Sequence, residues 1–222
     1  MLRTPAKVLS VNVTSVVHEG GWTGGKGRTG IDKQSVATPI RLVNDAVEGD
    51  LVADRKNHGG YDQAVYAYSR EDAEWWEREL EISIAYGRFG ENLTTQGIEV
   101  SGAVIGERWH IGSAIVEVAQ PRTPCRVFAG FWNRPNLIKE FTDAGRPGAY
   151  LRIMQEGQVR SGDEIVIAER PLHGITVADL FIARGEERFR IFEILAALES
   201  SDSVRHWAEN ITKRALDKEA QR

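Results

Sequence analysis

Ala114-Ile115-Val116-Glu117-Val118-Ala119 predicts a β-strand that runs directly into Gln120-Pro121-Arg122-Thr123-Pro124-Cys125-Arg126. β-branched residues make the first half typical of a strand, whereas the prolines of the second half favour a turn. Cys125 is the only cysteine in the chain, and an arginine lies near it on each side. Neighbouring positive charge lowers the pKa of a thiol, which favours a nucleophile or a ligand for a soft metal. A lone cysteine is also commonly a small core hydrophobe, so the residues alone leave both interpretations open.

The composition predicts one large globular domain, or a domain of about 170 residues with an appendage. A single cysteine cannot form an internal disulfide, and the first residues lack the apolar region of a secretory signal, so we expect a cytoplasmic protein. No apolar run reaches the roughly 18 residues that would span a membrane. The net charge of −4 gives no general attraction to nucleic acid or anionic lipid. We therefore expect neither a nucleic-acid nor a membrane partner, and any anion site must be local.

Residues 20–30 form a glycine-rich segment that predicts a loop. Its glycines are too many for the interior of a helix or strand. Two interpretations remain open: a flexible surface loop, or a cradle for an anion in which Lys26, Arg28 and Lys33 supply positive charge. The spacing differs from that of a nucleotide-binding P-loop.

Most of the chain up to residue 168 predicts short strands with one clear helix. The strand patterns occupy 7–13, 38–47, 51–53, 63–68, 105–111, 114–118, 150–154 and 164–168. Their spacing favours an antiparallel, barrel-like sheet. Ser69, with Asp72 three residues later, predicts the N-cap of a helix that runs to Leu80. Trp75 and Trp76 on that helix are predicted packing anchors, because adjacent helix residues point in different directions.

The pattern changes near Pro171. Helical periodicity predicts three short helices, the first capped by Thr176 and the others starting at Phe189 and Asp202. We therefore expect two domains, 1–170 and 171–222, the second a three-helix bundle. From Thr176 onward, eight Lys and Arg face nine Asp and Glu. Phosphate binding needs clustered positive charge, so a docking or dimerisation module, and hence a homodimer, is a better interpretation than a DNA-reading helix-turn-helix.

Six segments together resemble the MOSC domain, the family named for the C-terminal domain of molybdenum cofactor sulfurase, and within it the YiiM-like branch. They occur in the family's order and cover most of residues 7–168. The segments are 8–12, 29–33, 58–60 with Asp62 and 64–66, 89–93, 121–125 and 146–152. The resemblance implies a mixed α+β fold: a mainly antiparallel, β-barrel-like MOSC domain followed by a small three-helix C-terminal bundle.

The resemblance also implies a function. Members of the family bind the molybdenum cofactor, or molybdopterin, a pterin dithiolene that carries a phosphate. Relatives reduce N-hydroxylated compounds such as 6-hydroxylaminopurine and amidoximes, with electrons from a separate redox protein. The resemblance thus implies a detoxifying oxidoreductase with a small N-hydroxylated substrate and an external electron donor. No motif for binding flavin or nicotinamide is apparent in the sequence.

Cys125 stands where the family has its molybdenum-ligating cysteine, so the resemblance implies that it is both the metal ligand and the catalytic residue. A soft thiolate suits a polarisable metal. Arg146 and Arg152 are secondary candidates for cofactor contacts, and Glu91 is expected to orient an arginine. The cofactor-binding residues implied in this way are Arg28, Lys33, Arg55, Asn57, His58, Asn92 and Arg122.

Two other functions remain open. The chain could be a carrier that binds the cofactor, or holds sulfur as a persulfide on Cys125, and passes it on without sustained turnover. It could also be an interaction protein in which Cys125 is buried and inert. The five histidines show no zinc-site spacing, so a zinc centre is not expected.

Overall fold

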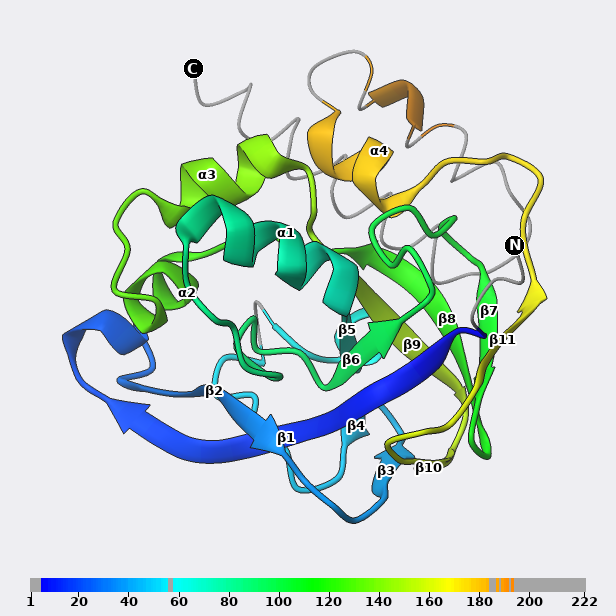
Figure 1. Cartoon of the computed structure of the whole chain (residues 1–222), viewed down its shortest axis with the longest axis horizontal. Helices are drawn as coiled ribbons and strands as arrows, with labels where there is room; N and C mark the ends of the chain where they lie inside the picture. Colours follow the sequence, from blue (N-terminus) through cyan, green and yellow to red (C-terminus); the bar gives the residue numbers. More distant parts are fainter. Residues whose placement is uncertain (1–4, 56–57, 184–186, 188, 192, 194–222) are drawn as a thin grey trace.

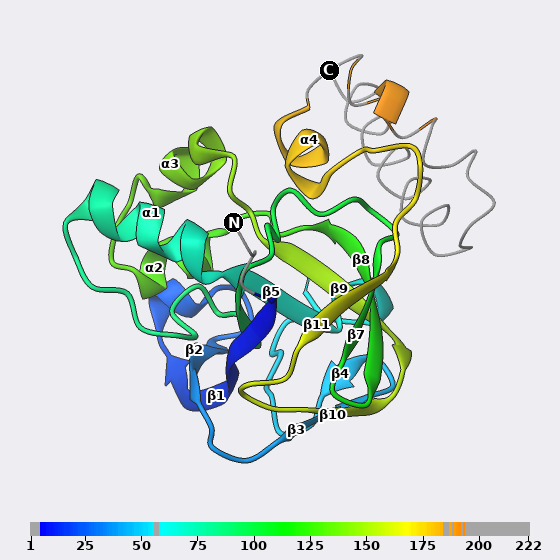
Figure 2. The same cartoon turned by 45° about the vertical axis from the view of Figure 1, so that its right-hand side comes forward.

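The computed structural model describes residues 5–55 and 58–183, together with residues 187, 189–191 and 193. Helices α1, α2 and α3 gather on one side of the strands, whereas β3, β4 and β10 lie together away from them (Figures 1 and 2). The named elements are β1 (Lys7–Glu19), η1 (Gly21–Thr23), β2 (Arg28–Ser35), β3 (Ile40–Val43), β4 (Ala46–Val47), η2 (Tyr61–Gln63), β5 (Val65–Ser69), α1 (Arg70–Leu80), β6 (Leu93–Gln96), β7 (Arg108–Ile111), β8 (Ala114–Pro121), α2 (Arg126–Phe131), α3 (Leu137–Ala144), β9 (Ala149–Gln155), β10 (Gly157–Val159), β11 (Ile165–Glu169) and α4 (Val177–Ile182).

Eight strands form one large sheet in the order β11-β7-β8-β9-β5-β6-β1-β2, and β10-β3-β4 form a smaller one. The strand pairings are antiparallel except that of β5 with β6, which confirms the mainly antiparallel arrangement. The predicted barrel is wrong: within the described residues, the large sheet stays open with β11 and β2 at its edges. An isolated bridge joins Lys7 of β1 to Glu164, just before β11. Backbone hydrogen bonds also link residues 6–8 to residues 162–165, but the register partners given for β11 itself lie on β7.

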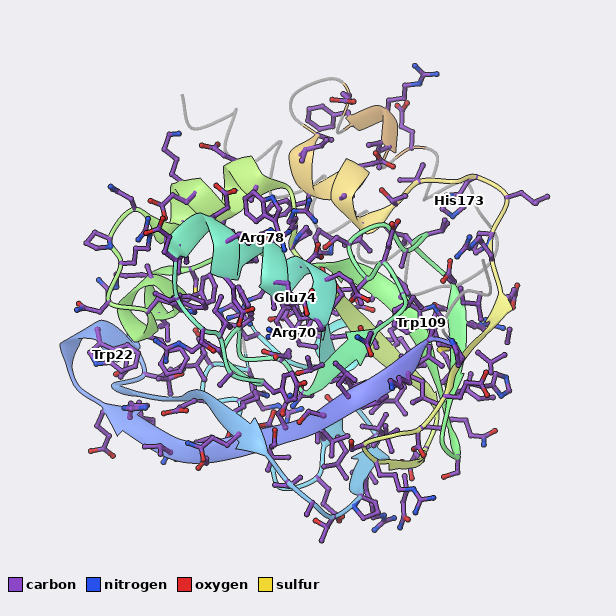
Figure 3. All side chains as sticks on the ribbon, in the orientation of Figure 1. Trp22, Arg70, Glu74, Arg78, Trp109 and His173 are labelled. Atoms are coloured by element: carbon purple, nitrogen blue, oxygen red, sulfur yellow. The ribbon has the colours of Figure 1, made fainter. Side chains whose placement is uncertain are left out.

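Buried apolar side chains form two clusters, one among the strands and one beneath helices α1, α2 and α3. Trp109 belongs to the first cluster and lies among the strands in Figure 3. In the second cluster, Trp76 stacks on Phe141 with ring centroids 5.9 Å apart and donates Nε1–H to the Tyr68 hydroxyl at 3.0 Å. Trp76 is therefore a packing anchor, as predicted, and Trp75, which is only partly buried, packs against the same cluster. Ser69 caps α1, as predicted, by accepting the backbone N–H of Asp72 at 3.2 Å.

Three local predictions need correction. Gly30, expected in the loop, lies inside β2. The position requires glycine, because an added Cβ would lie 2.5 Å from the carbonyl oxygen of Leu51. Residues 51–53, expected to form a strand, do not pair with any strand. Their first residue, Leu51, makes this close contact with β2. Helices α2 and α3 were not predicted, because runs of six and eight residues are too short for clear helical periodicity.

The first predicted C-terminal helix is α4, which Thr176 caps by a reciprocal pair of hydrogen bonds with Asp179, as in a capping box. Val177 and Leu180 of α4 are buried in the cluster among the strands. The second predicted helix falls largely, and the third wholly, outside the described residues. So does most of the predicted 171–222 domain, which stays a prediction. Within the part of the chain that is described, no helix is long and apolar enough to cross a membrane.

Candidate functional site

A cavity of about 420 Å³ opens where the β1–β2 hairpin, residues 45–55 and 58–60, and the start of α2 meet. The glycine-rich hairpin loop packs directly on α2, since an added Cβ at Gly24 or Gly130 would lie 3.0 Å from Val127 or Trp22. Trp22 marks that end of the molecule in Figure 3. Asn57 lies outside the described residues. The other sequence-predicted site residues all line the cavity: Arg28, Lys33, Arg55, His58, Asn92, Arg122 and Cys125.

Cys125 occupies the N-cap position of α2 in an extended conformation and is half-buried. Prolines at 121 and 124 disfavour a helix before this point, so the helix begins only at Arg126. Burial raises the pKa of the Cys125 thiol. A hydrogen bond with His58, the charge of Arg122 and the backbone N–H of Phe128 outweigh that effect, and the pKa falls from 9.0 to about 7. A large fraction of the thiol is therefore ionised near neutral pH.

Arg122 is a buried cation, only 6% exposed, without an ion-pair partner among the described residues. Its Nη1 donates to the carbonyl oxygen of Phe89 at 2.8 Å, and its guanidinium lies against the rings of Tyr66 and Phe128 at 4.8 and 4.9 Å. Nε has no hydrogen-bond partner. A buried charge is normally paired, so the guanidinium of Arg122 is suited to pair with an anion bound in the cavity.

The turn before Asn92 holds the acceptor of Arg122 in place. The buried carboxylate of Glu91 accepts the backbone N–H groups of Gly87 at 2.7 Å and Phe89 at 2.9 Å, and the hydroxyl of Thr94 at 2.9 Å. Gly87 has a φ of +83°, and an added Cβ would overlap the carbonyl oxygen of Lys33. Glu91 thus orients Arg122 indirectly, through the position of the Phe89 carbonyl.

Lys33 and Asn92 are already engaged within the protein. Asp50 pairs with Lys33 and accepts Nδ2–H of Asn92 at 2.9 Å, and its other oxygen accepts the Thr14 hydroxyl at 2.7 Å. Asn92 also accepts the backbone N–H of Tyr66 at 3.1 Å through Oδ1. Although burial opposes it, Lys33 holds the pKa of Asp50 below its usual value. These contacts pair the charge of Lys33 with a carboxylate inside the protein and make Lys33 and Asn92 parts of the cavity wall.

The rim of the cavity is basic and exposed. Arg55 pairs with Asp45 at 2.8 Å, whereas Lys26, Arg28 and Arg126 have no ion pair within the described part of the chain. The whole lining holds six Lys and Arg against three Asp. A chain with a net charge of −4 therefore has a locally positive cavity, which favours anionic ligands.

Sequence reasoning missed Asp50, Tyr66 and Tyr150 as lining residues. Tyr66 and Tyr150 belong to the family-like segments 64–66 and 146–152, which could have indicated them, whereas the role of Asp50 depends on contacts between distant segments. The secondary candidates lie elsewhere: Arg146 pairs with Asp72, and Arg152 belongs to an ion-pair row described below.

Comparisons with known proteins agree with this arrangement. The model of the MOSC domain family matches residues 54–166. YflK of Bacillus subtilis (strain 168), an uncharacterised protein, is 35% identical over 156 residues, which cover 70% of this chain and 71% of YflK. A Gibberella moniliformis protein named reductase is 29% identical over 172 residues, which cover 76% of this chain and 30% of that protein. The crystal structure of YiiM from Geobacillus stearothermophilus matches with a TM-score of 0.73 and 28% identity, covering 93% of this chain and 98% of that one.

The large sheet, its few helices and the matched segment define a class: the chain belongs to the MOSC domain family. Within the family it is YiiM-like, because the YiiM structure matches nearly its whole length.

Proposed function

We propose that this chain is a molybdenum-cofactor-dependent reductase of N-hydroxylated compounds such as hydroxylaminopurines and amidoximes. The observation that carries the proposal is the pair of Cys125 and Arg122, a partly ionised thiol beside a buried guanidinium with an unused donor, both lining one cavity. MOSC domains are generally associated with binding of the molybdenum cofactor. The relative named reductase supports oxidoreductase activity.

The residues present fit this cofactor. The sulfur of Cys125 is a soft ligand for the metal, and Arg122 with the basic rim offers donors for a phosphate. The bound cofactor would supply two-electron redox chemistry. His58, hydrogen-bonded to Cys125, can provide a proton within the cavity. Conversion of an N–OH group to N–H and water consumes two electrons and two protons, and a separate redox protein supplies the electrons.

The test is the molybdenum and pterin content per chain after expression in a host that makes the cofactor. The wild type should carry nearly stoichiometric amounts, and Cys125→Ala should lose the metal, whereas the exposed neighbour Thr123→Ala should keep it. Loaded protein should then reduce an amidoxime with a reconstituted electron donor. A loaded chain without turnover would favour a carrier. Absence of metal and pterin, despite loading of a control molybdoenzyme, would overturn the proposal.

A further inference from the structure

A row of alternating charges crosses four strands of the large sheet and ends on the short helix η2. Glu169 of β11 is the register partner of Arg108 on β7, which in turn faces Glu117 on β8, and Glu117 faces Arg152 on β9. The side chains pair along this row at 3.1, 3.0 and 2.8 Å. Arg152 then reaches out of the sheet to Asp62 of η2, with Nε 2.6 Å from Oδ1.

Arg152 attaches η2 to the sheet by side-chain contacts, in addition to the chain itself, which enters β5 two residues after η2 ends. Its side chain is fully buried and holds two carboxylates, those of Glu117 and Asp62. The ring of Tyr61, also in η2, lies 5.9 Å from the same guanidinium. Removing one partner of a buried ion pair is strongly destabilising, because it leaves charge uncompensated.

Hydrogen bonds to η2 hold the two glycines that follow His58, whereas the backbone N–H of His58 itself donates to the carbonyl oxygen of Asp54 at 2.8 Å. The backbone N–H of Gln63 donates to the carbonyl oxygen of Gly60 at 2.9 Å, and the side chain of Gln63 accepts the N–H of Gly59 at 3.1 Å. Gly59 and Gly60 have φ values of +85° and +83°, a conformation that glycine adopts without strain. The position of His58 beside Cys125 is therefore set from one side by η2 and from the other by the turn at Asp54.

We propose that Asp62 and Arg152 are positioning residues whose ion pair holds His58 against Cys125. Neither belongs to the lining of the cavity, so they act through the 58–63 segment rather than on a ligand. The inference rests on the proposed function for one point, the chemical roles of Cys125 and His58. The geometry itself belongs to the chain without any cofactor.

Hydrogen–deuterium exchange tests the tether directly. In Asp62→Ala, peptides covering residues 58–64 should exchange about tenfold faster, since local opening sets the exchange rate, while those covering β8 and β9 stay as in the wild type. Asp62→Asn keeps an oxygen acceptor for Arg152 but loses the charge, so its exchange rate should lie between those of the wild type and Asp62→Ala. Glu169→Ala, at the exposed outer end of the same row, is the matched control and should change nothing in this segment.

A double-mutant cycle tests whether the tether acts through His58. The readout is the rate at which iodoacetamide alkylates Cys125 in cofactor-free protein. Asp62→Ala should slow alkylation, and should have no further effect in a His58→Ala background. If Asp62→Ala does not fold, Asp62→Glu, which displaces the carboxylate by one methylene, replaces it with a smaller expected effect. Unchanged exchange in the 58–64 peptides, or additive effects on alkylation, would overturn the inference, and neither result bears on molybdenum binding.

Discussion

The two walls of the cavity use similar residue types in opposite ways. The satisfied wall consists of Lys33, Asp50 and Asn92, whose charges and hydrogen bonds are taken up by one another and by Thr14. The reactive wall consists of His58, Arg122 and Cys125, where a guanidinium nitrogen is unpartnered and a thiol is partly ionised. Positive charge alone therefore does not identify a ligand-binding residue. What decides is whether the protein has already used that residue's donors.

The largest expected effect comes from breaking the satisfied wall. Asp50→Ala leaves buried Lys33 without its counterion and removes an acceptor of Asn92 and Thr14. We expect the free energy of unfolding to fall by about 3–5 kcal/mol, as measured by urea denaturation. Asp45→Ala removes the exposed partner of Arg55 and should change the free energy of unfolding by less than about 1 kcal/mol. Equal losses in the two variants would contradict the distinction between a buried network and an exposed rim.

The next largest effect concerns the pKa of the Cys125 thiol in the reactive wall. The rate of Cys125 alkylation by iodoacetamide should rise with pH around a midpoint of about 7, the pKa of the thiol, because only the thiolate reacts. His58→Ala should move the midpoint upward, because burial still raises the pKa of the thiol while only Arg122 and the N–H of Phe128 remain to favour the thiolate. Arg55→Ala, on the exposed rim, should leave the midpoint in place. An unshifted midpoint in His58→Ala would mean that its hydrogen bond does not stabilise the thiolate.

The contrast between the walls also shows which features of the site can be predicted from the sequence. Most strands, the Ser69 cap and the motifs that reach the cavity were predictable, because each depends on residues close together in the chain, whereas β2, β6 and β10 were not predicted. The pairing of Asp50 with Asn92, 42 residues away, and of Arg122 with the Phe89 carbonyl, 33 residues away, was not. Such contacts are fixed only when β1, β2 and the turn at residues 87–92 meet. Sequence alone therefore placed Lys33 and Arg122 in one class, and the fold separates them.

The open sheet has a similar explanation. Alternating strands predict many antiparallel pairs, but closure depends on the path of the last strand, which local patterns do not encode. Gly30 was expected in a loop because glycine weakens strands. Glycine is nevertheless needed in this strand, because the backbone of Leu51 from another segment comes too close for a side chain.

A smaller effect tests the unused donor of Arg122. Arg122→Met loses the bond to Phe89 but also removes a desolvated charge. These opposing terms should keep the free energy of unfolding within about 1 kcal/mol of the wild type. Inorganic phosphate at about ten times its Kd should stabilise the wild type by roughly 1.4 kcal/mol, a rise of a few degrees in Tm, and the variant much less. Equal stabilisation of both proteins would locate the anion away from Arg122.

The smallest effects belong to the rim. Lys26→Ala and Arg126→Ala remove exposed, unpaired charges, so the free energy of unfolding should change by less than about 0.5 kcal/mol. Phosphate affinity, measured by the same thermal shift, should fall less than about threefold in each variant, and the loss should shrink as salt screens the rim. Arg122 is screened less because it is buried. If the rim variants instead lost more affinity than Arg122→Met, the anion would bind at the mouth, and the reactive wall would face only the uncharged part of a ligand.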